Sequence, residues 1–283
     1  MKNTIPKGKI SSKTCQIGDS VKQLDGKVAL VTGGTRNVGK GIALALGEAG
    51  ATVYVTGRSI TEQDVKGITE AGGRGIAIKC DHGNDDEVKK VFEYIEKKEE
   101  GQLDILVNNA WGGYNRLRNR SSFKGFKWKE VFWKQPVELW DEMNTVGVRS
   151  TFIASVFASN LMAQKKQGLI VNISFYASQK YYGNVIYGVA KASVDKMSTD
   201  MAIELKGLNI ACVSLYPGYI DDNKKKPNPK KESSQFSGRA IASLASDSNI
   251  LKRTGNILIA AELGVEYGFK DIDGTQPLPY DTI

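Results

Sequence analysis

Two polar side chains in the stretch Y-G-V-A-K, Tyr187 and Lys191, have the types and the spacing to perform acid–base chemistry. On a helix, residues four apart lie on one face about one turn apart. A free phenol has a pKa of about 10 and is a poor acid–base catalyst at neutral pH. A neighbouring ammonium favours the phenolate, so Tyr187 could exchange a proton with a carbonyl or alcohol oxygen. The same pattern also fits two unrelated side chains on an ordinary helix, so the rest of the chain has to decide.

Size and composition set the first limits. The chain has 283 residues, 41% of them hydrophobic, which is enough for one large core. We expect no transmembrane segment. Residues 1–22 are polar and carry five lysines without an apolar segment, so we expect a disordered basic tail; a weak transit peptide is the alternative. Three widely spaced cysteines and one histidine, His82, give no zinc pattern and fit a reducing compartment. We expect a cytoplasmic protein, with organelle targeting or peripheral membrane association left open.

Strand and helix patterns alternate along the chain. Strands are predicted at Val28–Val31, Thr52–Val55, Gly75–Lys79, Leu103–Val107, Leu169–Ile173, Ile210–Leu215 and Asn256–Ala260. Helices are predicted at Val38–Ala49, 61–71, Asp85–Lys98, about 136–165, about 184–206 and 237–246. The alternation predicts an α/β protein: a single-domain Rossmann fold over residues 23–283, with a doubly wound parallel sheet of about seven strands and helices on both faces.

A glycine turn, T-G-G-T-R-N-V-G-K-G at residues 32–41, joins the first strand to the first helix. Such a turn lets the backbone approach a pyrophosphate, and the following helix supplies N–H donors and a positive dipole. NAD sites usually place an acid after the second strand, whereas this chain has Arg58 there and Arg36 in the turn. Because Arg pairs with phosphate in a bidentate way, we expect NADP(H) rather than NAD(H).

These residues match a known family: the chain resembles the classical short-chain dehydrogenase/reductases. The resemblance covers about residues 24–265, with the motifs in the family's order and spacing. The shared marks are Thr32-Gly33 through Gly39, Asp81, Asn108-Asn109-Ala110, Ser174, Tyr187 with Lys191, and Pro217-Gly218. Four stretches resemble the dehydrogenase/reductase member 1 group more closely, namely A-T-V-Y-V-T-G-R (51–58), W-D-E-M-N-T-V-G (140–147), Y-G-V-A-K (187–191) and Y-G-F-K-D-I-D-G (267–274).

The resemblance implies a role for each matching residue. Ser174 would hold the substrate oxygen, and Tyr187 would donate or accept the proton. Lys191 would assist Tyr187 and bind the nicotinamide ribose, and Tyr187 and Lys191 both count among the cofactor-binding residues. The other cofactor-binding residues would be Gly33, Thr35, Arg36, Val38, Gly39 and Arg58 around the phosphates and ribose, Asp81 and Asn109 on the adenosine side, and Ile220 at the nicotinamide amide.

Three positions depart from the family pattern. The middle glycine of the turn is Asn37, which tolerates left-handed backbone better than most residues. Trp111 replaces the glycine that usually follows N-N-A. The family's fourth catalytic residue, an Asn, falls on Gly147. Asn144, one turn earlier, is a candidate to hold the relay water instead, and Gly147→Asn is expected to keep or raise the rate if the relay is limiting.

The leading interpretation is an oxidoreductase that transfers hydride between NADP(H) and a carbonyl or secondary alcohol substrate. The alternative is a catalytically impaired nucleotide-binding scaffold of the same fold. We expect a small-molecule substrate, a homo-oligomer and no nucleic acid partner. Two substrate loops, 111–135 and 219–236, would line the substrate pocket. Their sequences do not identify the substrate. The basic and aromatic 111–135 stretch is predicted to be a mobile lid or subunit contact, and the Lys224-Lys225-Lys226 run a solvated surface.

Overall fold

The structure, a computed structural model, describes residues 22–113, 127–224 and 226–280. Residues 1–21 of the basic tail predicted over residues 1–22, and the central part of the predicted lid, residues 114–126, therefore lie outside the described residues.

A single parallel sheet forms the centre of the molecule, with strand order β3-β2-β1-β4-β5-β6-β7. The strands are β1 (Val28–Val31), β2 (Thr52–Gly57), β3 (Arg74–Lys79), β4 (Ile105–Asn108), β5 (Gly168–Ile173), β6 (Ile210–Tyr216) and β7 (Ile257–Ile259). Strand β1 pairs with both neighbours, as in the registers Val28↔Thr52 and Ala29↔Ile105. The strand order reverses between β1 and β4, which is where parallel α/β sheets bind their ligands. The predicted seven-stranded fold is confirmed.

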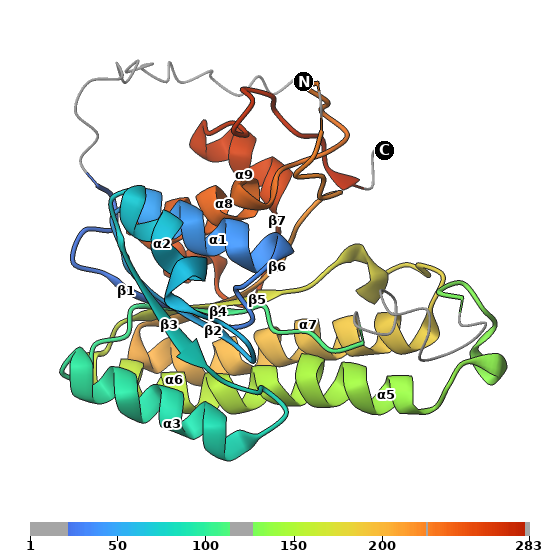
Figure 1. Cartoon of the computed structure of the whole chain (residues 1–283), viewed down its shortest axis with the longest axis horizontal. Helices are drawn as coiled ribbons and strands as arrows, with labels where there is room; N and C mark the ends of the chain where they lie inside the picture. Colours follow the sequence, from blue (N-terminus) through green and yellow to red (C-terminus); the bar gives the residue numbers. More distant parts are fainter. Residues whose placement is uncertain (1–21, 114–126, 225, 281–283) are drawn as a thin grey trace, which may run out of the picture.

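Helices cover both faces of this sheet. They are α1 (Asn37–Glu48), α2 (Glu62–Glu70), α3 (Asp85–Lys98), α5 (Glu138–Met143), α6 (Ser150–Lys165), α7 (Val185–Leu205), α8 (Ser234–Ser246) and α9 (Ala260–Tyr267). Short 3-10 helices lie at η1 (Phe132–Lys134), η3 (Tyr176–Ser178), η4 (Lys206–Leu208) and η5 (Ile250–Arg253). Figure 1 shows α1, α2 and α8 on one side of the sheet and α3, α6 and α7 on the other. Since both faces are covered, β1, β4 and β6 are buried along their length and mostly apolar.

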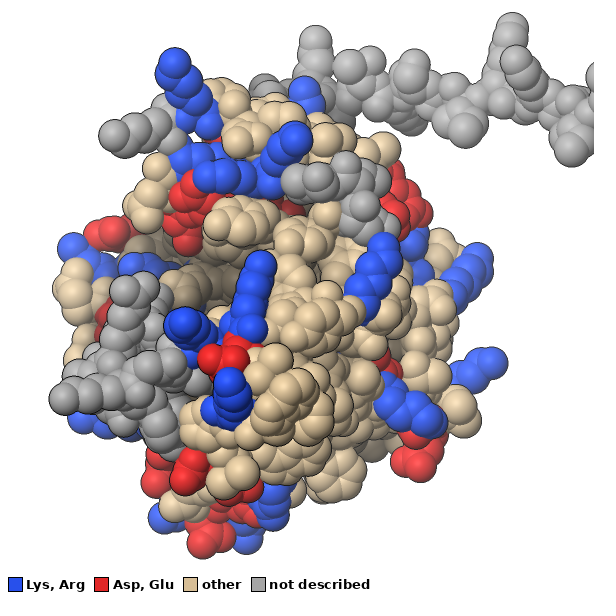
Figure 2. Space-filling view, turned by 90° about the vertical axis from the view of Figure 1, so that its right-hand side faces the viewer, with Lys and Arg blue, Asp and Glu red and all other residues tan. Residues whose placement is uncertain are grey.

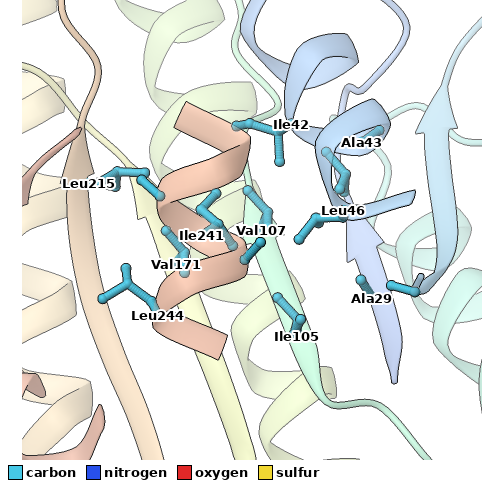
Figure 3. Packing of buried hydrophobic residues seen from close by; sticks show 14 of the residues in the cluster. Ala29, Ile42, Ala43, Leu46, Ile105, Val107, Val171, Leu215, Ile241 and Leu244 are labelled. Carbon is cyan, nitrogen blue, oxygen red and sulfur yellow. The ribbon is translucent and has the colours of Figure 1, made fainter. Parts of the chain in front are cut away.

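The packing of α8 against α1 and the sheet shows how the core fixes the nucleotide end. Ile241 and Leu244 of α8 point toward Val107 and Val171 of the sheet, beside Ile42 of α1 (Figure 3). All five side chains are fully buried. Burying one such side chain contributes about 1.5–3 kcal/mol, so this cluster holds α1, and with it the glycine turn, firmly against β1.

The long helix predicted over 136–165 is interrupted. Between α5 and α6 the backbone forms a π-helical segment, η2 (Asn144–Arg149). The hydroxyls of Ser150 and Thr151 donate to the carbonyl oxygens of Val146 and Gly147, the latter at 2.8 Å, and so satisfy backbone groups of this turn. Single π-turns are frequent at functional sites, and this one contains the position at which the family carries its fourth catalytic residue.

One described stretch, Glu138–Lys165, is long and apolar enough to cross a membrane by length and composition, whereas none was expected. A single such helix is weak evidence of a membrane span, because core helices pass the same test of length and composition; 44% of its apolar window is buried inside the protein.

Candidate active site

Helix α7 carries Tyr187 and Lys191, and its first turn fixes where they point. Asn184 caps the helix: its side-chain oxygen accepts from the Tyr187 backbone N–H at 3.0 Å. The Asn184 amide nitrogen in turn donates to the side-chain oxygen of Gln135 at 2.8 Å. Tyr187 and Lys191 are 6% and 5% exposed, so one face of the helix buries both polar groups. The predicted pair is therefore placed together and oriented by a cap.

Lys191 is enclosed by a backbone carbonyl and two aromatic rings. Its Nζ donates to the Ile173 carbonyl oxygen at 3.0 Å and lies 3.8 Å from the ring centroid of Trp111. The distance to the ring centroid of Tyr187 is 5.7 Å. Burial lowers the pKa of Lys191 to about 7, while the negative charge of Asp195 acts in the opposite direction. Its charge state at neutral pH thus depends on these few neighbours.

The phenol ring of Tyr187 lies in an aromatic box. The centroids of Trp128, Trp111 and Phe175 are 5.2, 5.6 and 6.4 Å away. The two tryptophans meet Tyr187 edge to face, a favoured geometry for aromatic pairs. Trp128 is itself held by a bond from its indole N–H to the Tyr182 carbonyl oxygen at 3.2 Å. The box restricts the ring and leaves the reacting end of the site apolar.

Ser174 directly follows β5 and is 2% exposed. Its backbone N–H donates to the Leu215 carbonyl oxygen at 2.9 Å, which extends the sheet by one residue. Its hydroxyl donates to the Lys191 carbonyl oxygen at 3.3 Å. Strand β5 and helix α7 therefore bring Ser174, Tyr187 and Lys191 together, as predicted.

A second polar cluster lies one turn further along α7 and was missed from the sequence. The Tyr216 hydroxyl donates to Asp195 and is also within hydrogen-bond distance of the Ser178 hydroxyl. Burial and the bond to Asp195 raise the pKa of the Tyr216 phenol above its ordinary value. The other carboxylate oxygen of Asp195 is buried without a hydrogen-bond partner among the described residues. Asp195 lies four residues after Lys191, a spacing that could have indicated it.

The glycine turn has the close backbone approaches that a dinucleotide site requires. Gly33 adopts a left-handed φ of +64°, and a Cβ there would lie 2.9 Å from the Cα of Ala110. The side-chain nitrogen of Asn109 donates to the carbonyl oxygens of Thr32 and Gly33, both at 3.0 Å. Asn37 has φ of +47°, so the residue in place of the middle glycine does take up left-handed backbone. The turn survives the substitution.

One cavity of about 520 Å³ joins the two ends of the site. It is lined by the predicted residues Gly33, Thr35, Arg36, Val38, Arg58, Asp81, Asn109, Ser174, Tyr187, Lys191 and Ile220, together with Trp111, Phe175 and Tyr182. Gly39 is buried behind this lining, where a Cβ would collide with Asn109. Figure 2 views the end of the molecule that carries the start of α7 and shows a hollow with Lys and Arg side chains beside it. The sequence motifs therefore converge on one space.

His82 has a structural position. It is 7% exposed, and its Nε2 lies 2.7 Å from the Thr56 hydroxyl. Burial lowers its pKa to about 4, so the ring is neutral at physiological pH. Among the described residues, no group of three His, Cys, Asp or Glu side chains could hold a metal ion. Cys80 and Cys212 are buried free thiols whose pKa burial raises to about 12.

The structure argues against two expectations from the sequence. The side-chain nitrogen of Asn144 donates to the Trp140 carbonyl oxygen at 2.8 Å, and Asn144 does not line the cavity, so it is not placed to replace the missing relay residue. A Cβ at Gly147 would lie 2.6 Å from the ring of Trp111. Gly147→Asn would therefore create a clash in the present structure and is not expected to keep the rate.

The predicted solvated surface at Lys224 is also wrong. The Lys224 side chain is 8% exposed, and its Nζ forms ion pairs with Asp271 at 2.7 Å and Asp273 at 2.8 Å. The lysine run alone gave no sign of this pairing, because the two acids lie nearly fifty residues later in the chain. Lys225 lies outside the described residues.

Comparisons with known proteins agree with this geometry. The sequence profile described as short chain dehydrogenase matches residues 27–233. The human protein "Dehydrogenase/reductase SDR family member 1" is 37% identical over 272 residues, covering 89% of this chain and 85% of its own length. The 3-oxoacyl-(acyl-carrier-protein) reductase FabG of Aquifex aeolicus is 31% identical over 206 residues, covering 70% of this chain and 76% of its own length.

A solved structure gives the same result. A putative short-chain alcohol dehydrogenase from Sinorhizobium meliloti superposes with a TM-score of 0.70 at 26% identity, over 85% of this chain and 97% of its own. The chain belongs to the short-chain dehydrogenase/reductase family, whose members are oxidoreductases that use nicotinamide cofactors.

Proposed function

We propose that this protein is an NADP(H)-dependent oxidoreductase that interconverts a carbonyl compound and a secondary alcohol. The observation that carries the proposal is the shared cavity: Ser174, Tyr187 and Lys191 line the same space as the glycine turn and Arg58. A dinucleotide bound at the helix α1 end would thus have room to extend toward the acid–base residues.

The bound cofactor would supply or accept the hydride, and the chain's own groups would handle the proton. Ser174 would hold the substrate oxygen, and the Tyr187 hydroxyl would give that oxygen its proton or remove it. The positive charge of Lys191 would stabilise the phenolate left on Tyr187. Since Tyr187 and Lys191 are both nearly buried, such charge effects act in a lower dielectric and are stronger than in solution.

The cofactor preference follows from the residues beyond β2. Strand β2 ends at Gly57, and the next residue is the exposed Arg58, with no acid to bind ribose hydroxyls. Arg36, at the N-cap of α1, lines the same cavity. Two guanidiniums at this end suit a 2′-phosphate, which supports NADP(H) over NAD(H).

The pocket walls support an apolar, bulky carbonyl substrate. Beyond Tyr187 the cavity is lined by the aromatic rings of Trp111, Phe175 and Tyr182. Two relatives are named for ketone–alcohol pairs: the 3-oxoacyl reductase of Aquifex aeolicus and a 3beta-hydroxysteroid dehydrogenase of Mediterraneibacter gnavus, 30% identical over 202 residues. An aromatic wall favours flat or extended apolar groups beside the reacting carbonyl.

One observation favours the alternative, a nucleotide-binding scaffold without turnover. Gly147 has no side chain to hold a relay water, and the ring of Trp111 fills the adjacent space. NADPH binding without reduction of any carbonyl would support this alternative.

The proposal is tested by following NADPH absorbance with a panel of aldehydes and ketones of increasing aromatic size. We expect turnover with the larger members. Tyr187→Phe should abolish turnover and leave the NADPH dissociation constant within about twofold, because the phenol proton matters in the transition state. The exposed Tyr181 provides the matched control, Tyr181→Phe, which should behave like the parent. Turnover by Tyr187→Phe at the parent rate would place the chemistry elsewhere.

A further inference from the structure

The surroundings of Gly147 explain why this position lacks a side chain. A Cβ there would lie 2.6, 2.8 and 3.0 Å from three carbon atoms in the six-membered ring of Trp111. The backbone of Gly147 does not take a left-handed φ, so its conformation would admit other residues. Gly147 is therefore required by the space that Trp111 occupies.

Trp111 is not held in this place by a hydrogen bond. Its indole N–H is buried and has no partner among the described residues. Trp111 lies three residues after the end of β4, and the next residue, Gly112, packs so closely that a Cβ there would collide with the Glu142 carbonyl oxygen of α5. The indole thus lies between the π-helical turn and α7, with its ring centroid 3.8 Å from the Lys191 ammonium.

We propose that Trp111 is a positioning residue for Lys191: its indole takes the place of the side chain missing at Gly147 and seats the ammonium on the ring face. This inference rests on the proposed function, in which Lys191 serves Tyr187 and the cofactor. A cation within about 6 Å of a Trp centroid is attracted by the ring quadrupole, most strongly where water is excluded. Among the described residues, the Ile173 carbonyl supplies a directional bond at 3.0 Å, and the indole face supports the rest of the group.

The competing explanation is that Trp111 only fills space. In that case, any apolar side chain of similar bulk would serve, and the loss of the π face would have no separate effect. Trp111→Phe and Trp111→Leu form a matched pair, because both leave a cavity and only the first keeps an aromatic face. Asp195 and Tyr187, the titratable groups on α7 beside Lys191, are unchanged in both variants.

The first experiment compares these two variants in turnover and in the pH profile of kcat/KM. We expect Trp111→Leu to lose about tenfold in kcat and Trp111→Phe to stay within about threefold of the parent. Without the ring face the ammonium form of Lys191 is less favoured, so the decline of activity at high pH should begin at lower pH in Trp111→Leu than in Trp111→Phe. Equal losses and identical profiles in the two variants would overturn the proposal.

The second experiment needs no substrate, and so it separates this inference from the proposed function. Thermal unfolding is measured for Gly147→Asn, Trp111→Gly and the double variant. We expect Gly147→Asn to lower the midpoint in the parent but not in the Trp111→Gly background, where space for the amide has been opened. If the changes in unfolding midpoint of the two single variants simply add in the double variant, then Trp111 does not occupy the space of a side chain at position 147. Non-additive changes in the midpoint, in a protein that reduces no carbonyl, would support the packing of Trp111 in place of a side chain at position 147 and would contradict the proposed function.

Discussion

A substitution at Arg58 gives the most direct test of the cofactor preference. It is accessible to solvent, lines the cavity and directly follows the last residue of β2. A guanidinium in this place can pair with a 2′-phosphate, whereas a carboxylate would repel it and bond the ribose hydroxyls instead.

We therefore expect Arg58→Asp to weaken NADPH binding at least tenfold, about 1.4 kcal/mol, while NADH affinity stays the same or rises. Calorimetric titration of both cofactors measures the two changes. Lys206→Asp, the same charge change at an exposed residue after α7, serves as the control. Equal affinity of the parent for NADPH and NADH would sink the assignment to NADP(H).

At this scale the sequence was informative where a residue belongs to a local motif. Ser174, Tyr187 and Lys191 follow from order and spacing, and the structure brings them to one cavity. The contact between Trp111 and Lys191 joins residues eighty positions apart and depends on the position of the π-helical turn. Such contacts are fixed by packing in three dimensions, which no spacing in the sequence encodes.

Among the elements, the start of β4 shows how neighbouring strands are tied together below the site. Asp104, 6% exposed, accepts from the Val28 N–H and the Lys27 ammonium, both at 2.9 Å. It also accepts from the side chains of Gln102 and Gln167, both at 2.6 Å. One carboxylate therefore joins the starts of β1, β4 and β5. Burial would raise the pKa of Asp104, but the bonds from Gln102, Val28 and Lys27 outweigh it and hold that pKa below its ordinary value.

Asp104→Asn should lower the free energy of unfolding by about 2 kcal/mol at pH 7, since it removes a buried charge from four donors. Because the folded pKa is depressed, the carboxylate's contribution is complete above the unfolded pKa, near 3.9, and is lost as the pH falls through the folded value. The difference in the free energy of unfolding between parent and variant should therefore become smaller below about pH 4. Urea denaturation across pH measures it, with the exposed Glu204→Gln as control. A difference in the free energy of unfolding that does not change with pH would show that the Asp104 carboxylate does not stabilise the fold through its charge.

The elements themselves were predicted well where the pattern is periodic. Helix α3 has the predicted bounds Asp85–Lys98, because its apolar stripe and its Asn84 cap are local signals. Helix α9 was missed since it follows the short β7 without a break. The π-helical turn was missed because the helical pattern continues from α5 into α6. The hydroxyls of Ser150 and Thr151 bond locally to the turn, four residues back, and only the packing of Trp111 against Gly147 is a tertiary contact.

At the scale of the whole molecule, the C-terminal segment packs against the residues that form the aromatic wall of the cavity. The ring of Tyr280 packs against Phe175 and Tyr176 at 5.1 and 5.7 Å, and its hydroxyl donates to that of Tyr182 at 2.9 Å. The Leu278 N–H donates to the Pro229 carbonyl oxygen at 2.7 Å. The last described residues thus support both the aromatic wall and the predicted substrate loop 219–236.

Asp271 is the anchor of this arrangement. Its side chain is fully buried, pairs with Lys224 and accepts from the backbone N–H of Ser233 at 2.8 Å, just before α8. Burial alone would raise the pKa of Asp271, but the bonds from Lys224 and Ser233 outweigh that effect and hold the pKa below its ordinary value. The ion pair between Asp271 and Lys224 is therefore intact at neutral pH and is lost as the pH falls through the lowered pKa of Asp271.

Lys224→Met should release the loop, since it keeps the apolar stem of the side chain and leaves Asp271 buried with one charge uncompensated. Breaking a buried ion pair by removing one partner costs about 3 kcal/mol, which urea denaturation should detect at pH 7. Because loop 219–236 carries Ile220 on the cavity wall, we also expect a higher KM with a smaller change in kcat. The exposed Lys230→Met is the matched control and should alter neither quantity. If Lys224→Met unfolds at the parent's urea concentration and keeps the parent's KM, then the ion pairs do not hold the loop, and the C-terminal segment does not act on the site through Lys224.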